Sequence, residues 1–386
     1  MRFIIQQIRL MILILLFSGI RAENFSNIRE PEFLLLMNDL WVDEVLNKMT
    51  LDQKIAQLMM PAFSPKQDDF DKMLDIIQKY QPGGLIVMRG NPSLTTEYIN
   101  RFQERSAVPL FIAIDGEWGP AMRIDSVMPF PYAQTIGAVT DPAFIYQMGR
   151  DIGNQMKQMG INVNFTPVAD INTNPQNPVI NFRSFGEDKA DISKKSWYLA
   201  GGMQDSGVVP VAKHFPGHGD TSTDSHLGLP VINHTKERID IVESFPFRYL
   251  KEAGIAGIMT GHLSVPALDP SGAPASVSEK IINGYLKKEI GFKGLVFTDA
   301  VNMKGVQTVR KNIEAEALKA GNDIVVFTPD MKRAIDAVKK AVIDGELSAE
   351  VIENRCRRVL ALKRWAGLQN YKPADTKNIV DRLNSP

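Results

Sequence analysis

Short apolar segments alternate with helical segments along nearly the whole chain. Most of these apolar segments are continuous rather than alternating, which indicates strands buried on both faces. We expect a helix between each strand and the next. This pattern predicts an α/β fold, a single (β/α)8 TIM-type barrel with extra N- and C-terminal helices. The predicted strands cover residues 55–60, 85–88, 110–114, 163–168, 208–212, 257–260, 295–298 and 323–327.

Polar residues directly follow several of the predicted strands. In a closed barrel the reaction site lies at the carboxyl ends of the strands. An open doubly wound sheet places its ligands at the same ends. The distribution therefore predicts a site there without deciding whether the sheet closes. The residues concerned are Asp115, Asp170, Lys213-His214, His262 and Asp299.

The predicted helices carry local start signals. Thr50-Leu51-Asp52-Gln53 resembles a capping box, and Asp141-Pro142 places an aspartate cap before a proline. Two helices, 331–343 and 349–365, follow the last strand. We expect four regions: a signal peptide at 1–22, an N-terminal helical segment at 23–44, the barrel at 45–368 and a polar C-terminal tail at 369–386.

The N-terminus predicts export. Arg2 and Arg9 precede an apolar run at residues 10–20. This run is shorter than the roughly 20 apolar residues that a membrane-spanning helix needs. We expect a secretory signal cleaved near Ala22, an uncleaved anchor being the alternative. The mature protein is then secreted, into the periplasm, with no stable membrane association.

Composition narrows the classes of partner. The chain has 44 basic and 44 acidic residues and no basic block, so a nucleic acid partner is not expected. The single cysteine, Cys356, cannot form an intramolecular disulfide, and its helical surroundings predict a buried structural thiol. The sequence does not indicate an oligomeric state.

The stretch from Val208 to Pro230 concentrates groups that can carry chemistry. Taken singly, Lys213 could be a solvated charge, His214 a core histidine, and His218 or His226 a loop residue. Their clustering after one apolar strand instead indicates a reaction site. Asp224 lies two residues before His226, and a carboxylate that orients a histidine makes a usable proton shuttle near neutral pH.

Asp299 follows the apolar strand 295–298. An aspartate there could be a nucleophile, a metal ligand or a helix cap. The same ambiguity applies to Asp115 and to Asp170, and we expect the role of Asp170 to be mainly structural.

Four separated motifs together resemble the β-N-acetylglucosaminidases of glycoside hydrolase family 3. The resemblance covers about residues 45 to 365, and its specificity comes from the agreement of all four motifs in order. The motifs are Asn181-Phe182-Arg183-Ser184-Phe185-Gly186, Lys213-His214-Phe215-Pro216-Gly217-His218-Gly219, Asp224-Ser225-His226 and Phe297-Thr298-Asp299.

The resemblance implies three catalytic roles. Asp299 matches the nucleophile that forms a covalent glycosyl-enzyme in a retaining mechanism. His226 matches the acid/base residue, and Asp224 matches the carboxylate that holds its imidazole. Most retaining glycosidases use two carboxylates, so the histidine departs from the general pattern, though not from this subfamily.

The resemblance also implies the substrate-binding residues. Arg183, Lys213 and His214 match positions that hold the N-acetylglucosamine ring. Asp115 matches the position that binds the outer hydroxyls of the sugar, and Arg123 stands at the family's matching arginine. The chain departs from the family's Gln-Glu-Gly-Gly run, because it has Gly116-Glu117-Trp118-Gly119-Pro120 instead. Trp118 could alter the outer subsites or could belong to the core.

The implied function is that of an exo-β-N-acetylglucosaminidase that hydrolyses terminal N-acetylglucosamine from glycans such as peptidoglycan fragments. No cofactor and no metal are expected. Three alternatives stay open: a phosphorylase that uses phosphate as acceptor, a metal hydrolase, and a non-catalytic glycan-binding barrel. The metal hydrolase would use His214, His218, Asp224 and His226 as ligands.

Overall fold

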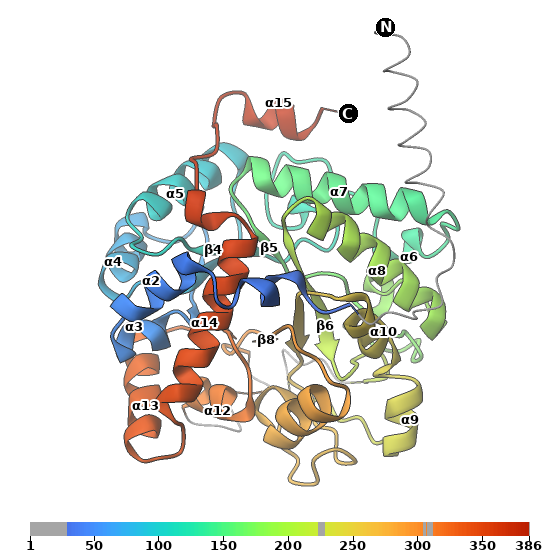
Figure 1. The fold of residues 1–386 in the computed structure, drawn as a ribbon. Helices are drawn as coiled ribbons and strands as arrows, with labels where there is room; N and C mark the ends of the chain where they lie inside the picture. Colours follow the sequence, from blue (N-terminus) through green and yellow to red (C-terminus); the bar gives the residue numbers. More distant parts are fainter. Residues whose placement is uncertain (1–28, 223–227, 304–305, 307–311, 386) are drawn as a thin grey trace, which may run out of the picture.

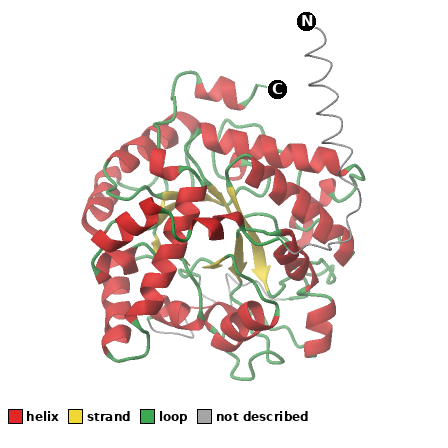
Figure 2. Ribbon diagram, viewed as in Figure 1, coloured by secondary structure: helices red, strands yellow, loops and turns green. Residues whose placement is uncertain are grey.

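The computed structural model describes residues 29–222, 228–303, 306 and 312–385. The predicted signal peptide and the predicted catalytic residues Asp224 and His226 lie outside these residues. In the described part of the chain, strands occupy the centre of the molecule and helices surround them (Figures 1 and 2). None of the described helices is long and apolar enough to cross a membrane.

The central sheet of the described chain is parallel and has seven strands, in the order in which they occur along the chain. A second parallel sheet pairs β1 (Met59–Met60) with β9 (Val325–Val326). The strands of the central sheet are β2 (Ala62–Phe63), β3 (Gly84–Val87), β4 (Phe111–Ile114), β5 (Val163–Asn164), β6 (Val209–Phe215), β7 (Gly257–Thr260) and β8 (Leu295–Thr298).

The predicted α/β class is confirmed, whereas the predicted ring of eight strands is observed as a curled seven-stranded sheet beside a two-stranded one. The first predicted strand, 55–60, is wrong at its start, because Ile55 and Ala56 end helix α3 (Leu51–Ala56). Pro61, which has no N–H to donate, separates β1 from β2. The Pro61 carbonyl accepts a hydrogen bond from Ile86 of β3.

Contacts also join the two sheets at the other edge. Phe297 of β8 forms an isolated parallel bridge with Ile324, the residue before β9. On the far side of β9, the Val325 N–H donates to the Leu58 carbonyl at 2.8 Å. The two-stranded sheet thus contacts both β8 and the segment that leads into β2.

The strands are buried on both faces, as their apolar sequences predict. In β4, Phe111 and Ala113 pack in one hydrophobic cluster, while Ile112 and Ile114 pack in another. This alternation follows the two-residue period of a strand. All four side chains are fully buried, so the sheet has a core on each side.

Helices begin where the local signals predict. In the capping box of α3, Thr50 Oγ1 accepts from the Gln53 N–H, and Gln53 Oε1 accepts from the Thr50 N–H. Asp141 caps α7, which begins at Pro142. Between β6 and β7, where one helix is expected, the chain forms two, α9 and α10. The helices are α2 (Leu40–Lys48), α4 (Phe70–Tyr80), α5 (Pro92–Glu104), α6 (Ala133–Ile136), α7 (Pro142–Gln158), α8 (Lys189–Asp205), α9 (Lys236–Ile241), α10 (Phe245–Ala253), the π-helix η5 (Lys280–Glu289), α12 (Ile313–Ala320), α13 (Met331–Ile343), α14 (Ala349–Trp365) and α15 (Ile379–Leu383), with short 3-10 turns at η1 (Glu32–Leu36), η2 (Pro120–Met122), η3 (Asn181–Arg183), η4 (Ala275–Val277) and η6 (Leu368–Asn370).

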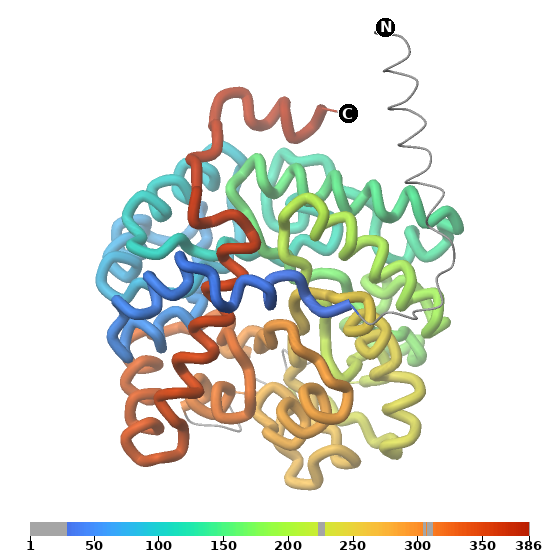
Figure 3. Tube along the Cα trace, in the orientation of Figure 1, coloured from blue at the N-terminus to red at the C-terminus, as the bar shows by residue number. Residues whose placement is uncertain are grey.

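Both ends of the described chain pack on the helices that surround the sheets. The segment from η1 to α2 lies beside α14 (Figure 3), where Arg364 Nε contacts Asp39 Oδ2 at 3.1 Å. Cys356 of α14 is fully buried, as predicted. The polar tail contains α15, whose Ile379 and Leu383 are buried against the rest of the molecule.

Candidate active site

The carboxyl ends of the strands bring the predicted polar residues together. Asp115 follows β4, and Asp299 follows β8. Strand β6 continues to Phe215, beyond its predicted end, so Lys213 and His214 lie within the last residues of the strand. The backbone register between β6 and β7 shifts between Ala212 and Phe215, at the point where these two side chains occur.

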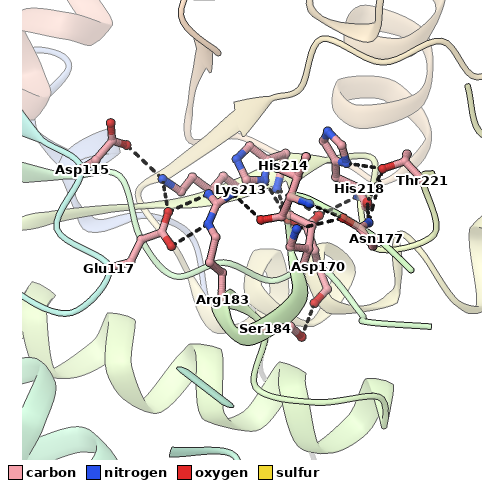
Figure 4. Close-up of polar contacts among 12 residues, drawn as sticks. Asp115, Glu117, Asp170, Asn177, Arg183, Ser184, Lys213, His214, His218 and Thr221 are labelled. Atoms are coloured by element: carbon pink, nitrogen blue, oxygen red, sulfur yellow. Dashed lines mark hydrogen bonds and ion pairs between the residues drawn. The ribbon is translucent and has the colours of Figure 1, made fainter. Parts of the chain in front are cut away.

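Lys213 is the centre of a partly buried ionic cluster, which we call the Lys213 cluster (Asp115, Glu117, Arg123, Arg183 and Lys213). Its Nζ lies 3.0 Å from Asp115 Oδ1 and 2.8 Å from Glu117 Oε1 (Figure 4). Burial alone would lower the pKa of Lys213, but the negative charges of Asp115 and Glu117 outweigh the effect of burial and raise that pKa. Lys213 is therefore a cation at neutral pH.

Asp115 is held by two cations. Besides Lys213, Arg123 Nη2 donates to Asp115 Oδ2 at 2.8 Å. Burial alone would raise the pKa of Asp115, but the charges of Lys213 and Arg123 lower it to about 2. The carboxylate is therefore ionised at neutral pH and can accept hydrogen bonds.

Glu117 pairs with Arg183 through two parallel hydrogen bonds. Arg183 Nε donates to Oε2 at 2.9 Å, and Nη2 donates to Oε1 at 2.7 Å. Burial opposes ionisation of Glu117, but Arg183 and Lys213 hold its pKa well below the usual range. The pair joins the loop after β4 to η3, and so it fixes the orientation of the guanidinium in the site.

Asp170 positions His214. The Asp170 carboxylate is fully buried and accepts from the His214 N–H at 3.2 Å and from the His218 N–H at 2.7 Å. His214 Nδ1 lies 2.7 Å from Asp170 Oδ2. Burial alone would raise the pKa of Asp170, but the interactions with His214 and His218 outweigh burial and lower that pKa. Nδ1 of His214 therefore faces an anion and carries a proton.

His218 is a second buried histidine beside His214. The ring centroids are 5.7 Å apart, and His218 Nδ1 lies 2.7 Å from Thr221 Oγ1. Burial and the charge of His214 lower the pKa of His218 to about 4, so the ring is neutral at pH 7. Among the described residues, no group hydrogen-bonds to its buried Nε2.

Asp299 is ionised in the same region. Its Oδ1 accepts from the Ala300 N–H at 2.7 Å, and its own N–H donates to the Thr260 carbonyl. Burial raises the pKa of Asp299, but the nearby charges of His262, His214 and Lys213 outweigh it and lower that pKa. A half-buried, anionic carboxylate at a strand end is suited to attack on an electrophilic carbon.

The structure therefore joins five of the eight predicted site residues into direct contact networks. Asp299 interacts with His214 and Lys213 electrostatically. Sequence reasoning missed Glu117 as a partner of the site and gave His218 no separate role. The position of Glu117, two residues after the strand-end Asp115, is the only signal that could have found it. The five residues in the networks are Asp115, Arg123, Arg183, Lys213 and His214.

A cluster of potential metal ligands lies apart from the histidines considered in the metal hypothesis. Among the described residues, Asp220, His234 and Glu243 have ligand atoms within 4.8 Å of one another. Arg238 already approaches this group, with Nε 3.1 Å from Glu243 Oε1 and Nη2 3.6 Å from Asp220 Oδ2. The guanidinium supplies the positive charge that a metal would bring.

The comparisons with known proteins agree on one family. Residues 50–362 match the model of the Glycosyl hydrolase family 3 N terminal domain. Beta-hexosaminidase A of Pseudoalteromonas piscicida is 32% identical over 327 residues, which are 76% of this chain and 55% of that protein. A Beta-N-acetylglucosaminidase/beta-glucosidase of Cellulomonas fimi is 28% identical over 339 residues, 85% of this chain and 60% of that protein. The chain thus spans 55% and 60% of the length of these two relatives.

A solved structure gives the same result. The glycoside hydrolase family 3 beta-N-acetylglucosaminidase from Paenibacillus sp. str. FPU-7 superposes with a TM-score of 0.79 at 33% identity. The similarity covers 87% of this chain and 68% of that one.

Proposed function

The chain belongs to glycosyl hydrolase family 3, and we propose that it is a retaining exo-β-N-acetylglucosaminidase, an enzyme of the β-hexosaminidase class. The observation that carries the proposal is the environment of Asp299. This half-buried carboxylate is kept anionic by His262, His214 and Lys213 at the strand ends where the Lys213 cluster lies. The names of the relatives from Pseudoalteromonas piscicida and Cellulomonas fimi support the same activity.

In the proposed mechanism, a carboxylate oxygen of Asp299 attacks the anomeric carbon while the bond to the leaving oxygen breaks. His226 protonates that oxygen, then removes a proton from the water that releases the sugar. Asp224 holds the His226 ring and stabilises its cationic form. Asp224 and His226 lie outside the described residues, so their roles rest on the Asp224-Ser225-His226 motif.

The binding roles follow from the chemistry of the Lys213 cluster. Sugar hydroxyls are donors and acceptors, so they pair with charged groups of either sign. We assign Arg183, Lys213 and His214 to the N-acetylglucosamine ring, and Asp115 with Arg123 to its outer hydroxyls. The pair of cations on Asp115 favours the ionised form that accepts from hydroxyl groups.

For the natural substrate we propose terminal N-acetylglucosamine of peptidoglycan fragments, met after export to the periplasm. The apolar run at residues 10–20, preceded by Arg2 and Arg9, supports export. A comparison of purified muropeptides with chitobiose would test this substrate. Equal or better cleavage of chitobiose would count against a muropeptide preference.

Asp299→Asn tests the proposed activity because it removes the negative charge with little change in shape. We expect hydrolysis of 4-nitrophenyl β-N-acetylglucosaminide to fall by about 10³-fold or more. Asp71→Asn, at an exposed aspartate of α4, is the matched control. Wild-type activity in Asp299→Asn would contradict the proposal. The same assay with added phosphate distinguishes a phosphorylase, which would yield N-acetylglucosamine 1-phosphate in place of the free sugar.

A further inference from the structure

Three aromatic rings meet beside the Lys213 cluster, and we call them the aromatic rim (Trp118, Tyr132 and Phe182). The centroids of Trp118 and Tyr132 are 4.9 Å apart at an interplanar angle of 89°, and those of Tyr132 and Phe182 are 4.9 Å apart at 58°. Tyr132 is 48% exposed and Phe182 is 42% exposed. Large aromatic residues gathered on a surface commonly mark a binding site.

The aromatic rim is attached to the site through the backbone. Trp118 directly follows Glu117, and Phe182 directly precedes Arg183. The loop that carries Trp118 is therefore joined to η3, which carries Phe182, by the bidentate Glu117–Arg183 pair. The pair is largely buried, whereas Tyr132 and Phe182 reach solvent, so the rings lie outward from the pair.

Local contacts hold the aromatic rim in place. The Phe130 N–H donates to the Trp118 carbonyl at 3.1 Å. Gly119 has a φ of +80°, and a Cβ at this position would meet the Phe130 ring at 2.7 Å, so this tight turn requires glycine. Tyr132 is the N-cap residue of α6, which contacts η3, where Phe182 lies. A preformed surface of this kind binds without a large ordering cost.

The chemistry of the aromatic rim suits a pyranose ring. The faces of such a ring present C–H groups, which pack on aromatic faces, and its edge presents hydroxyls, which need polar partners. In an exo-acting enzyme the terminal sugar occupies the innermost, polar part of the site. The next unit of the substrate must then extend toward solvent, and the exposed rings of Tyr132 and Phe182 offer it an aromatic surface next to the Glu117–Arg183 pair.

We propose that the aromatic rim is the subsite for the leaving-group sugar, so that the enzyme prefers a pyranose over a small alcohol as the leaving group. This inference rests on the proposed function. It assigns Trp118 to substrate recognition, in the place where the chain departs from the family's Gln-Glu-Gly-Gly run. Tyr132 and Phe182 would stack on the second sugar or pack against its apolar face.

Two substrates with the same terminal sugar test the inference. Methyl β-N-acetylglucosaminide has a small leaving group, and N,N′-diacetylchitobiose has a pyranose. We expect Tyr132→Ala and Phe182→Ala each to lower the ratio of kcat/KM for chitobiose to that for the methyl glycoside about three- to tenfold. Tyr132→Phe, which keeps the ring, should leave the ratio within about twofold of the wild-type value. Phe144→Ala, at an exposed ring on α7, controls for loss of any surface aromatic residue.

Two results would overturn the inference. One is an equal loss on both substrates, which would indicate that the rings only support the Glu117–Arg183 pair. The other is an unchanged ratio in the double variant Tyr132→Ala/Phe182→Ala, with its melting temperature showing that it is folded.

Binding measured without turnover separates this inference from the proposed function. Calorimetric titration of chitobiose into Asp299→Asn should give weaker binding when Tyr132→Ala is added. If the wild type cleaves neither substrate, the proposed hydrolase activity fails, and the titration still decides the binding surface. Chitobiose binding that Tyr132→Ala leaves unchanged, or no binding at all, would then contradict the aromatic subsite.

Discussion

Arg183 and Glu117 face each other across two loops and share two parallel hydrogen bonds, at 2.9 and 2.7 Å. Only a planar guanidinium makes this fork, so the glutamate fixes both the place and the orientation of the arginine. Lys213 contacts the same carboxylate at 2.8 Å. Glu117 thus positions two of the cations that we assign to the sugar, although it was not among the residues predicted from the sequence.

Glu117→Gln should lower kcat/KM on the aryl glycoside about 10- to 100-fold, because the amide donates where both cations need an acceptor. Arg183→Lys should have a loss of similar size. The double variant should lose little more than either single variant, since each single change already breaks the Glu117–Arg183 pair. Fully additive losses, measured in one set of kinetics, would contradict a positioning role. Glu97→Gln, at an exposed glutamate of α5, is the control.

Asp170→Asn should destabilise the fold. The carboxylate is fully buried and accepts from two backbone N–H groups and the His214 ring, so the variant places an amide donor against some of those donors. We expect the free energy of unfolding, measured with urea, to fall by about 2 to 4 kcal/mol. An unchanged midpoint of unfolding would show that the carboxylate does not support His214.

The buried side chain of Lys363 should make the stability of the fold depend on pH. Its ammonium is fully buried on α14, donates to Gln57 Oε1 at 2.7 Å and lies over the Phe111 ring. Burial lowers the pKa of Lys363 to about 7. Between about pH 7 and pH 10 the unfolded chain therefore binds more protons at this residue, and stability rises with pH. Below about pH 7 the residue is protonated in both the folded and the unfolded chain, and the free-energy cost of burying its charge is then at its maximum.

Lys363→Met should remove this dependence. The free energy of unfolding of the wild type should rise by about 3 to 5 kcal/mol more than that of the variant between pH 7 and pH 10. Urea titrations at several pH values measure the difference. Lys72→Met, at an exposed lysine of α4, should show the wild-type dependence. Parallel curves for Lys363→Met and the wild type would contradict an ionisable, buried Lys363.

The strand-end residues were predictable because their signal is local. A continuous apolar run followed by a polar residue identifies Asp115, Lys213, His214 and Asp299 without knowledge of the fold. Glu117 has only a weaker signal, its place two residues beyond the strand end, because the tertiary structure is what brings it to Arg183, 66 residues further along the chain. The division of the first strand at Pro61 was also missed, since the apolar run before it continues the helical pattern of α3.

His226→Ala should slow substrates according to their leaving group. An aryl leaving group with a low pKa departs without a proton, so formation of the glycosyl-enzyme should be nearly unaffected, whereas chitobiose cleavage should fall about 10²- to 10⁴-fold. Pre-steady-state release of 4-nitrophenol separates the first step from the second. An equal loss in the first step for good and poor leaving groups would contradict the acid role.

The central claim is that Asp299 forms a bond to the sugar. Incubation of the wild type with a slow 5-fluoro N-acetylglucosaminyl fluoride, followed by proteolysis and mass spectrometry, would locate that bond. We expect one equivalent of label, on the peptide that contains Asp299. A label on another carboxylate such as Asp115, or turnover of the reagent with no labelled peptide at any time, would contradict the account.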